Sequence, residues 1–296
     1  MTREREIYKV TLVGSAGNVA LLTFKFIAGF VGHSSAMIAD AVHSLSDFLT
    51  DLVVLAFVHV SSKPQDDSHD YGHGKYETMA AFLIALALLA AAAGIMVSGS
   101  LRLWAWSQGE QLAKPGMVAL WAAIVSIAVK EGLYQYTVIK GRRLDSPAVV
   151  SNAWHHRSDA LSSIGAALGI GGAIALGNRW TVLDPIASLV VGIMLIKVSV
   201  DLLKRSVGEL TDGSLPEDME QEIVGIITSQ PHVSEPHHLR TRRIGNCLAI
   251  EVHVRMDGNM SLTEAHHHVT QIEQTLKQRF GASTLVTIHM EPIPQD

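Results

Sequence analysis

The chain has 296 residues, of which 48% are hydrophobic and only 17% charged, an apolar excess larger than one soluble core of this length needs. The formal net charge is -5 at pH 7 and no dense basic run occurs, which excludes nucleic acid as a partner. A single cysteine, Cys247, excludes an intrachain disulfide.

The apolar excess is concentrated in residues 1–210. Crossing about 30 Å of hydrocarbon takes roughly 20 helical residues, and six segments reach that length. These predicted spans lie near 10–31, 36–60, 79–101, 117–139, 154–177 and 182–203. Lys and Arg are more frequent in the connections on the side of the two termini, which the positive-inside rule places in the cytoplasm. The sequence therefore predicts an all-α, six-helix transmembrane domain in a lipid bilayer.

Residues 211–296 have the mixed polarity of a soluble domain. The predicted elements, in chain order, are a helix that opens at Pro216-Glu217-Asp218, strands at 237–243 and 247–256 around a Gly245-Asn246 turn, a helix at 261–280 and a strand at 284–291. The order αββαβ indicates a small cytoplasmic α+β, ferredoxin-like domain in which two helices cover one sheet.

Two predicted spans carry the same pair of residue types. His43 precedes Asp47 by four residues, and His155 precedes Asp159 by four, which places each pair on one helix face. Buried carboxylates are costly in a membrane, and metal coordination offsets that cost. If the two faces meet, two imidazoles and two carboxylates form a tetrahedral Zn²⁺ site. Three other ionisable residues of these spans are interpreted as lining a wet vestibule or the membrane interface: Asp40, Asp51 and His156.

The loop after the second span and the C-terminal domain hold further clusters. Residues 66–75 contain two histidines and several aspartates, which can bind a second metal or simply form a solvated loop. In the C-terminal domain, His237, His253, His289 and Glu291 can converge, because Glu291 follows His289 by two residues on one strand face. Of His266, His267 and His268, at most one or two can point to the same site on a helix.

These motifs, together with Tyr71-Gly72-His73-Gly74-Lys75 and Leu239-Arg240-Thr241-Arg242, resemble the cation diffusion facilitator family of proton-coupled metal exporters over essentially the whole chain. The resemblance implies homodimers joined by the C-terminal domain and a multi-pass protein of the bacterial inner membrane. Many bacterial relatives have Asp at the positions of His43 and Glu291. The site residues that it implies are an intramembrane transport site of His43, Asp47, His155 and Asp159; a loop site of Asp66, His69 and His73; a tail site of His237, His253, His266, His289 and Glu291; and a charge interlock of Lys75 with Asp212.

The predicted function is efflux of a divalent transition metal, with Zn²⁺ as the transported ion and protons as the counter-ion. Zn²⁺ is also expected to bind the C-terminal domain in a structural or regulatory role. We expect residues 1–210 to transport and residues 211–296 to bind metal and dimerise. The alternatives are an Fe²⁺ or Mn²⁺ exporter and a metal sensor that does not transport. An enzyme is not expected, because the chain has no His-Glu-x-x-His stretch and four protein ligands leave no place for a catalytic water.

Overall fold

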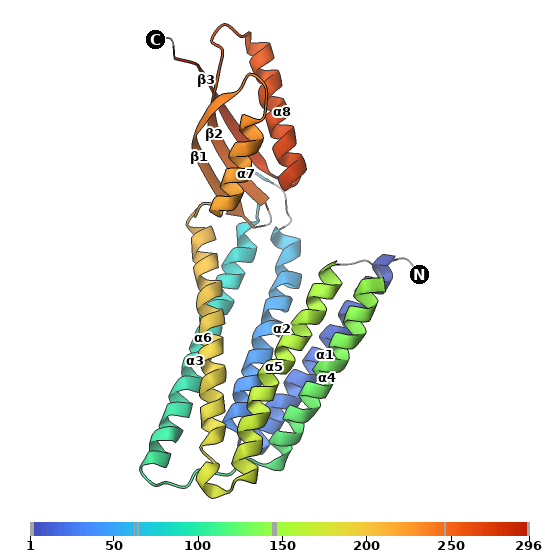
Figure 1. The fold of residues 1–296 in the computed structure, drawn as a ribbon, viewed down its shortest axis with the longest axis vertical. Coiled ribbons are helices and arrows are strands. Elements are labelled where there is room, and N and C mark those ends of the chain that lie inside the picture. The colour runs from blue at the N-terminus through green and yellow to red at the C-terminus, as the bar shows by residue number, and fades with distance from the viewer. Residues whose placement is uncertain (1–2, 62, 64, 144–146, 246, 295–296) are drawn as a thin grey trace. The chain divides into compact units, whose positions relative to one another are not determined.

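The computed structural model describes residues 3–294 except 62, 64, 144–146 and 246. The chain divides into two compact units, one made of residues 1–52 and 84–201 and the other of residues 53–83 and 202–296. Six long helices form most of the first 210 residues (Figure 1): α1 (Arg3–Val31), α2 (Ser35–Ser61), α3 (Lys75–Ser107), α4 (Met117–Arg143), α5 (Pro147–Ala175) and α6 (Leu183–Leu210). A short 3₁₀ turn, η1 (Asn178–Trp180), precedes α6.

Five of these helices, in the part of the chain that the structure describes, are long and apolar enough to cross a membrane. They are α1, α3, α4, α5 and α6. The remaining one, α2, has 27 residues, and Asp40, His43 and Asp47 interrupt its apolar sequence. Every predicted span overlaps one helix, with ends that differ by up to seven residues, since helix ends are not set by hydropathy alone.

Small side chains allow the helices of the first unit to pack closely. Helix α4 packs along α5 and against α1. Their shared core consists mostly of alanines, with Ala119, Ala122 and Ala123 of α4 fully buried. The Gly116 nitrogen donates a hydrogen bond of 2.8 Å to the Gly32 oxygen. Because neither residue has a side chain, the two backbones can come this close. Close backbone approach through small residues is how helices associate in a bilayer.

A carboxylate of α6 holds the start of α2. Asp184 is 2% exposed and accepts hydrogen bonds from Ser34 Oγ at 2.5 Å and from the backbone nitrogens of Ser35 and Ala36. These nitrogens are among the first of the helix, which have no partner within it. The negative charge also favours the positive end of the helix dipole. Asp184 therefore fixes the helix that carries His43 and Asp47.

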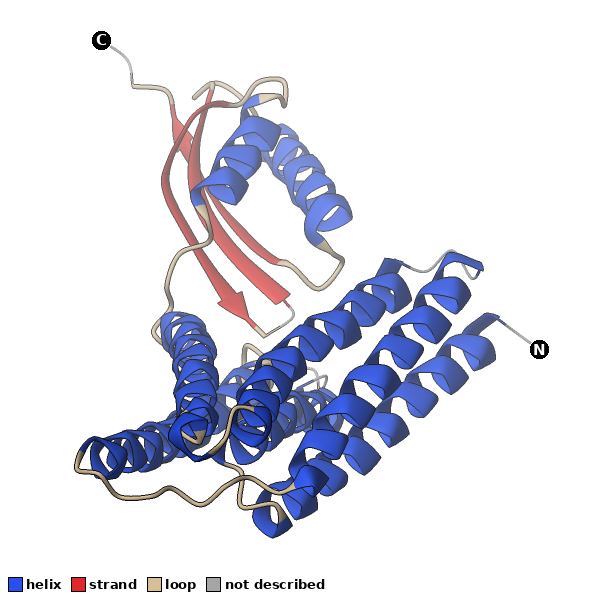
Figure 2. Cartoon of the chain, turned by 60° about the horizontal axis from the view of Figure 1, so that its bottom comes forward, coloured by secondary structure: helices blue, strands red, loops and turns tan. Residues whose placement is uncertain are grey.

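The C-terminal domain contains α7 (Glu217–Thr228), β1 (Ser234–Ile244), β2 (Cys247–Met256), α8 (Leu262–Phe280) and β3 (Leu285–Pro292). The sheet has the order β1-β2-β3, in which β2 is antiparallel to β1 and parallel to β3. Figure 2 shows the three strands with both helices on one side. This confirms the predicted αββαβ fold, in which α8 is the crossover that a parallel pair requires.

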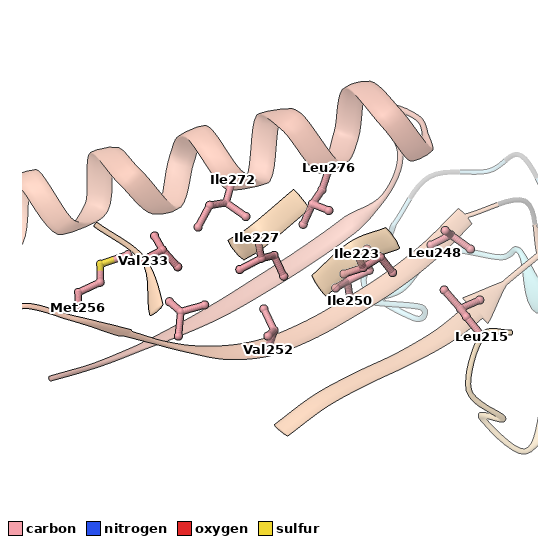
Figure 3. Close-up of a cluster of buried hydrophobic side chains, with 11 residues drawn as sticks. Leu215, Ile223, Ile227, Val233, Leu248, Ile250, Val252, Met256, Ile272 and Leu276 are labelled. Atoms are coloured by element: carbon pink, nitrogen blue, oxygen red, sulfur yellow. The ribbon is translucent and has the colours of Figure 1, made fainter. Parts of the chain in front are cut away.

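The core of this domain lies between the sheet and its two helices (Figure 3). Alternate residues of β2, from Leu248 to Met256, point toward Ile223 and Ile227 of α7 and toward Ile272 of α8. The residues between them, His253 included, point to the opposite face, because successive strand side chains alternate. The uncovered face of the sheet is therefore where polar side chains gather.

Candidate metal centres

Three candidate metal ligands meet between α2 and α5 in the first unit. One ligand atom each of His43, Asp47 and Asp159 lies within 4.8 Å of the others. His43 and Asp47 are half-buried, and Asp159 is 3% exposed. The four-residue spacing places His43 and Asp47 on one face of α2, as helical geometry requires. The side chain of His155, the fourth predicted ligand, lies outside the described residues, so its role stays a prediction.

The spacing of this cluster is wider than that of ligands on one tetrahedral ion. Two ligand atoms that are each about 2.0–2.1 Å from a tetrahedral zinc are about 3.3–3.4 Å apart. Ligand atoms that lie within 4.8 Å of one another must therefore approach by up to about 1.4 Å to share an ion. Rotation about the two side-chain torsions of each residue moves its ligand atom over such a distance.

Two buried lysines of the first unit each form an ion pair with an aspartate. Lys130 Nζ of α4 is 2.6 Å from Asp159 Oδ2. Lys25 Nζ of α1 is 2.7 Å from Asp40 Oδ2, and both of those side chains are fully buried. Neither lysine is among the site residues predicted from the sequence, although a lysine in the middle of an apolar span is as costly as an aspartate and indicates a partner by the same reasoning.

The interpretation of Asp40 and His156 as residues of a wet vestibule or interface is wrong. Asp40 has no exposed surface, and besides Lys25 it is hydrogen-bonded by Ser163 Oγ at 3.0 Å. His156 is 2% exposed. Helix periodicity shows that residues share a face, but it does not show whether a neighbouring helix covers that face. The side chain of Asp51 lies outside the described residues.

A second cluster forms in the loop before α3. Asp66 Oδ2 is 3.6 Å from His73 Nε2, and Asp66 Oδ1 is 3.8 Å from His69 Nδ1. The two imidazole rings are tilted by 37° to each other, with centroids 4.2 Å apart, and Tyr76 contacts both. One ligand atom of each of Asp66, His69 and His73 lies within 4.8 Å of the others.

Local hydrogen bonds keep Asp66 ionised. The Ser68 hydroxyl and backbone nitrogen and the His69 nitrogen all donate to its carboxylate, at 2.7 to 2.9 Å. These bonds, chiefly that from the Ser68 side chain, lower the pKa of Asp66 to about 2. An anionic oxygen is therefore present at any physiological pH, ready for a cation.

The third cluster lies on the uncovered face of the C-terminal sheet. His237 of β1, His253 of β2 and His289 of β3 are partners in the strand register, so they form one row across the sheet. Glu291 Oε1 is 2.9 Å from His253 Nδ1, and Oε2 is 3.2 Å from His237 Nε2. His289 Nε2 is 3.8 Å from Glu291.

A bulge in β1 brings an additional histidine to this row. The register shifts on both sides of His237, and Glu235 and His238 have positive φ angles of 46° and 50°. A bulge re-aims side chains beside it, and the rings of His237 and His238 both lie within 5.4 Å of the His253 ring. Propensity alone does not show a bulge, so the sequence analysis did not assign His238 to the site.

His266, the fifth predicted tail ligand, is placed elsewhere. It is on α8, and its Nδ1 is 3.1 Å from the Thr270 hydroxyl. Among the described residues of the C-terminal domain, only His237, His253 and Glu291 each have a ligand atom within 4.8 Å of the other two. The hydrogen bond from His253 is the main reason that the pKa of Glu291 lies below its ordinary value. This carboxylate is thus anionic and available as a metal ligand.

An ion pair connects the start of α3 to the segment after α6 within the second unit. Lys75 Nζ is 2.7 Å from Asp212 Oδ1, and Arg242 lies 3.6 Å from the other oxygen. The hydrogen bond from Lys75 lowers the pKa of Asp212. Nearby, Glu209 accepts hydrogen bonds from Thr78 and from the Gly245 nitrogen. The predicted charge interlock pair is therefore in contact, while its role in transport stays a prediction.

The chain combines a helical membrane domain with a separate α+β domain, and each contains a cluster of His and carboxylate side chains. This combination is typical of membrane metal-ion transporters. Residues 11–211 match the cation efflux transmembrane domain, and residues 215–293 match the cation efflux protein, cytoplasmic domain. The chain therefore belongs to the cation diffusion facilitator family, whose members are cation efflux transporters. This confirms the family and the general function expected from the sequence.

Individual relatives are similar over most of the chain. The manganese efflux system protein MneP of Bacillus subtilis is 30% identical over 98% of this chain and 97% of its own length. Metal tolerance protein C1 of Arabidopsis thaliana is 35% identical over 96% of this chain, which spans 62% of that protein's length. The metal-bound C-terminal domain of the CzcD transporter from Thermotoga maritima is 34% identical over 26% of this chain and 91% of that one, with a TM-score of 0.25.

Proposed function

We propose that the chain exports Zn²⁺ in exchange for protons and holds the ion at His43, Asp47, His155 and Asp159. The observation that supports this most is the approach of His43, Asp47 and Asp159 to within 4.8 Å of one another between α2 and α5. Ionisable groups gathered inside a membrane domain mark an ion pathway. Imidazole and carboxylate in equal number suit Zn²⁺ in tetrahedral coordination.

Exchange for protons follows from the ligand chemistry. Imidazole and carboxylate bind metal only when deprotonated, so metal and protons compete for the same atoms. In alternating access, Zn²⁺ binds from the cytoplasm, and protons from the other side displace it. The two histidines are the ligands that exchange protons near neutral pH.

Manganese is the second candidate metal, because the B. subtilis relative is named as a manganese efflux protein. Mn²⁺ prefers oxygen-rich, octahedral sites, and the described cluster offers one imidazole nitrogen beside two carboxylates. Fe²⁺ tolerates such mixed ligands as well. Zinc remains the first choice because the second imidazole, from His155, would complete a set with two nitrogens.

The remaining assignments follow the same proposal. Residues 1–210 transport the ion, and residues 211–296 form a cytoplasmic domain that binds Zn²⁺ at His237, His253 and Glu291 and joins two protomers. Both termini are cytoplasmic, and the protein resides in the bacterial inner membrane. Metal at the tail would stabilise the conformation of this domain that presents the ligands, and through it cytoplasmic zinc would regulate transport.

Flux into proteoliposomes tests the function directly. Purified full-length protein is expected to take up Zn²⁺ faster than Mn²⁺ or Fe²⁺ and to release protons from the lumen as zinc enters. Asp47→Ala is expected to abolish uptake, whereas Asp67→Ala, an exposed loop aspartate outside the proposed sites, is expected to leave it unchanged. A tenfold loss of uptake corresponds to about 1.4 kcal/mol. Uptake by Asp47→Ala above about a tenth of the wild-type rate would contradict the assignment of Asp47 as a metal ligand.

If the wild type takes up no metal, the protein is better explained as a metal sensor, and a preference for Mn²⁺ favours the second candidate metal.

A further inference from the structure

Lys130 is a buried cation at the edge of the proposed transport site. Its side chain on α4 is 2% exposed. The ammonium lies between two acceptors on different helices: Asp159 Oδ2 of α5 at 2.6 Å and Asn18 Oδ1 of α1 at 2.9 Å. One acceptor belongs to a proposed metal ligand, and the other is a neutral amide.

A metal ion at Asp159 would bring two positive charges to one carboxylate. Zinc is bound about 2.0–2.2 Å from a carboxylate oxygen, and the Lys130 ammonium is 2.6 Å from an oxygen of that group. Like charges in a buried site repel strongly, because water does not screen them. Either the ammonium moves away when the metal arrives, or the metal binds weakly.

Asn18 gives the ammonium a place to move to. Its carbonyl already accepts a hydrogen bond from Lys130 and competes with no metal. The lysine stem has four rotatable carbons, so the contact with Asp159 can lengthen while the contact with Asn18 is kept. In the metal-free site the same ammonium neutralises one of the carboxylates, which lowers the cost of an empty site in the bilayer.

Lys25 is a second buried lysine of the same domain, and its contacts include no proposed metal ligand. Its ammonium contacts Asp40 at 2.7 Å and both Ser44 Oγ and Ser163 Oγ at 3.0 Å, which engages all three of its N–H groups. None of these partners belongs to the group of His43, Asp47 and Asp159. Lys130, by contrast, donates to two acceptors among the described residues, Asn18 and Asp159, and the metal needs one of them.

We propose that Lys130 is a tethered cation: it occupies the Asp159 carboxylate when the site is empty, withdraws toward Asn18 when metal binds, and so sets how tightly the metal is held and how fast it leaves. This inference rests on the proposed function, in which Asp159 is a ligand. It makes Lys130 a positioning residue that acts on the metal through Asp159.

Opposite kinetic effects are expected when each end of this arrangement is changed. In proteoliposomes loaded with the full-length protein, Lys130→Gln removes the competing charge, so the KM for Zn²⁺ is expected to fall about tenfold and kcat to fall as well, because a tightly held ion leaves slowly. Asn18→Leu removes the neutral acceptor and leaves the ammonium on Asp159, so KM is expected to rise about fivefold. Lys25→Gln serves as the matched control and is expected to lower thermal stability without tightening zinc binding.

The outcomes separate this inference from the proposed function. An unchanged or raised KM in folded Lys130→Gln overturns the role of the tethered cation, as does a KM that falls equally in Lys25→Gln. If Lys130→Gln does not fold, Asn18→Leu decides alone, and an unchanged KM there overturns the inference. Zinc uptake that persists in Asp159→Ala instead refutes the transport site itself.

Discussion

Replacing Asp159 by Asn tests how much the ion pair with Lys130 stabilises the membrane domain. The charged atoms are 2.6 Å apart, and the side chains are 4% and 2% exposed, so water cannot reach an ammonium that is left alone. Removing one partner of a buried pair costs about 3–5 kcal/mol. Because Asn18 still accepts one hydrogen bond, we expect about 3 kcal/mol, or roughly 6–12 °C in the midpoint of thermal unfolding.

The double variant Asp159→Asn with Lys130→Gln separates stability from function. With both charges removed, no unpaired charge stays buried, and about 2 kcal/mol of the loss is expected to return. Zinc uptake is not expected to return, because the anionic ligand is still missing. The assay is the soluble fraction of detergent-solubilised protein after heating, measured for wild type, both single variants and the double variant, followed by uptake into proteoliposomes.

Two results would refute this reasoning. If Asp159→Asn melts within about 1 °C of wild type, far less than the cost expected for a broken buried pair, the pair does not hold the helices together. If the double variant recovers both stability and zinc uptake, Asp159 serves packing and is not a ligand. Asp67→Asn, in an exposed loop, controls for the general effect of replacing an aspartate.

Three further predictions concern selectivity, pH and metal removal. His43→Asp makes the proposed transport site richer in anionic oxygen, so uptake of Mn²⁺ and Cd²⁺ relative to Zn²⁺ is expected to rise. If the ratios of these uptake rates are equal in wild type and His43→Asp, His43 does not select the metal. Lys75 lowers the pKa of Asp212 below its ordinary value of 3.8, so this ion pair stabilises the fold above that pH and is lost as pH falls through the lowered pKa. The difference in melting temperature between wild type and Asp212→Asn is therefore expected to be constant from about pH 5 to 8, and a change within that range would contradict the assignment. Full-length protein with His253→Ala and His289→Ala is expected to bind fewer zinc ions per protomer by calorimetry. Chelation is expected to lower the melting temperature of wild type more than that of this variant, which keeps the proposed transport site. Unchanged stoichiometry would remove the tail site.

The sequence predicted elements and ligand pairs wherever one local pattern was enough. Hydropathy located six helices, and alternation of Leu248, Ile250 and Val252 located β2 and its covered face. Four-residue spacing placed His43 and Asp47 together. Each of these inferences uses only the geometry of one element, which is why each could be made without knowing its neighbours.

What the sequence did not show depends on contacts between elements. The burial of Asp40 requires Lys25 from another helix, and the position of His238 beside His253 requires the bulge in β1. His266 has a helix position that fits a ligand, but α8 directs it toward Thr270. Composition cannot reveal which of several candidate partners a folded chain brings within reach.

The three candidate centres share one feature that bears on how each would bind metal. In every one, a carboxylate already has a partner that carries positive charge or donates a hydrogen bond. These partners are Lys130 at Asp159, the Ser68 hydroxyl at Asp66 and His253 at Glu291. Metal binding at each site is therefore an exchange of partners. At Glu291 the partner is itself a potential ligand and at Asp66 it is neutral, so the metal displaces no fixed charge in either case. Only at Asp159 is the partner a cation that cannot become a ligand while it stays protonated. The site with this built-in competitor is the proposed transport site, from which the ion must also leave.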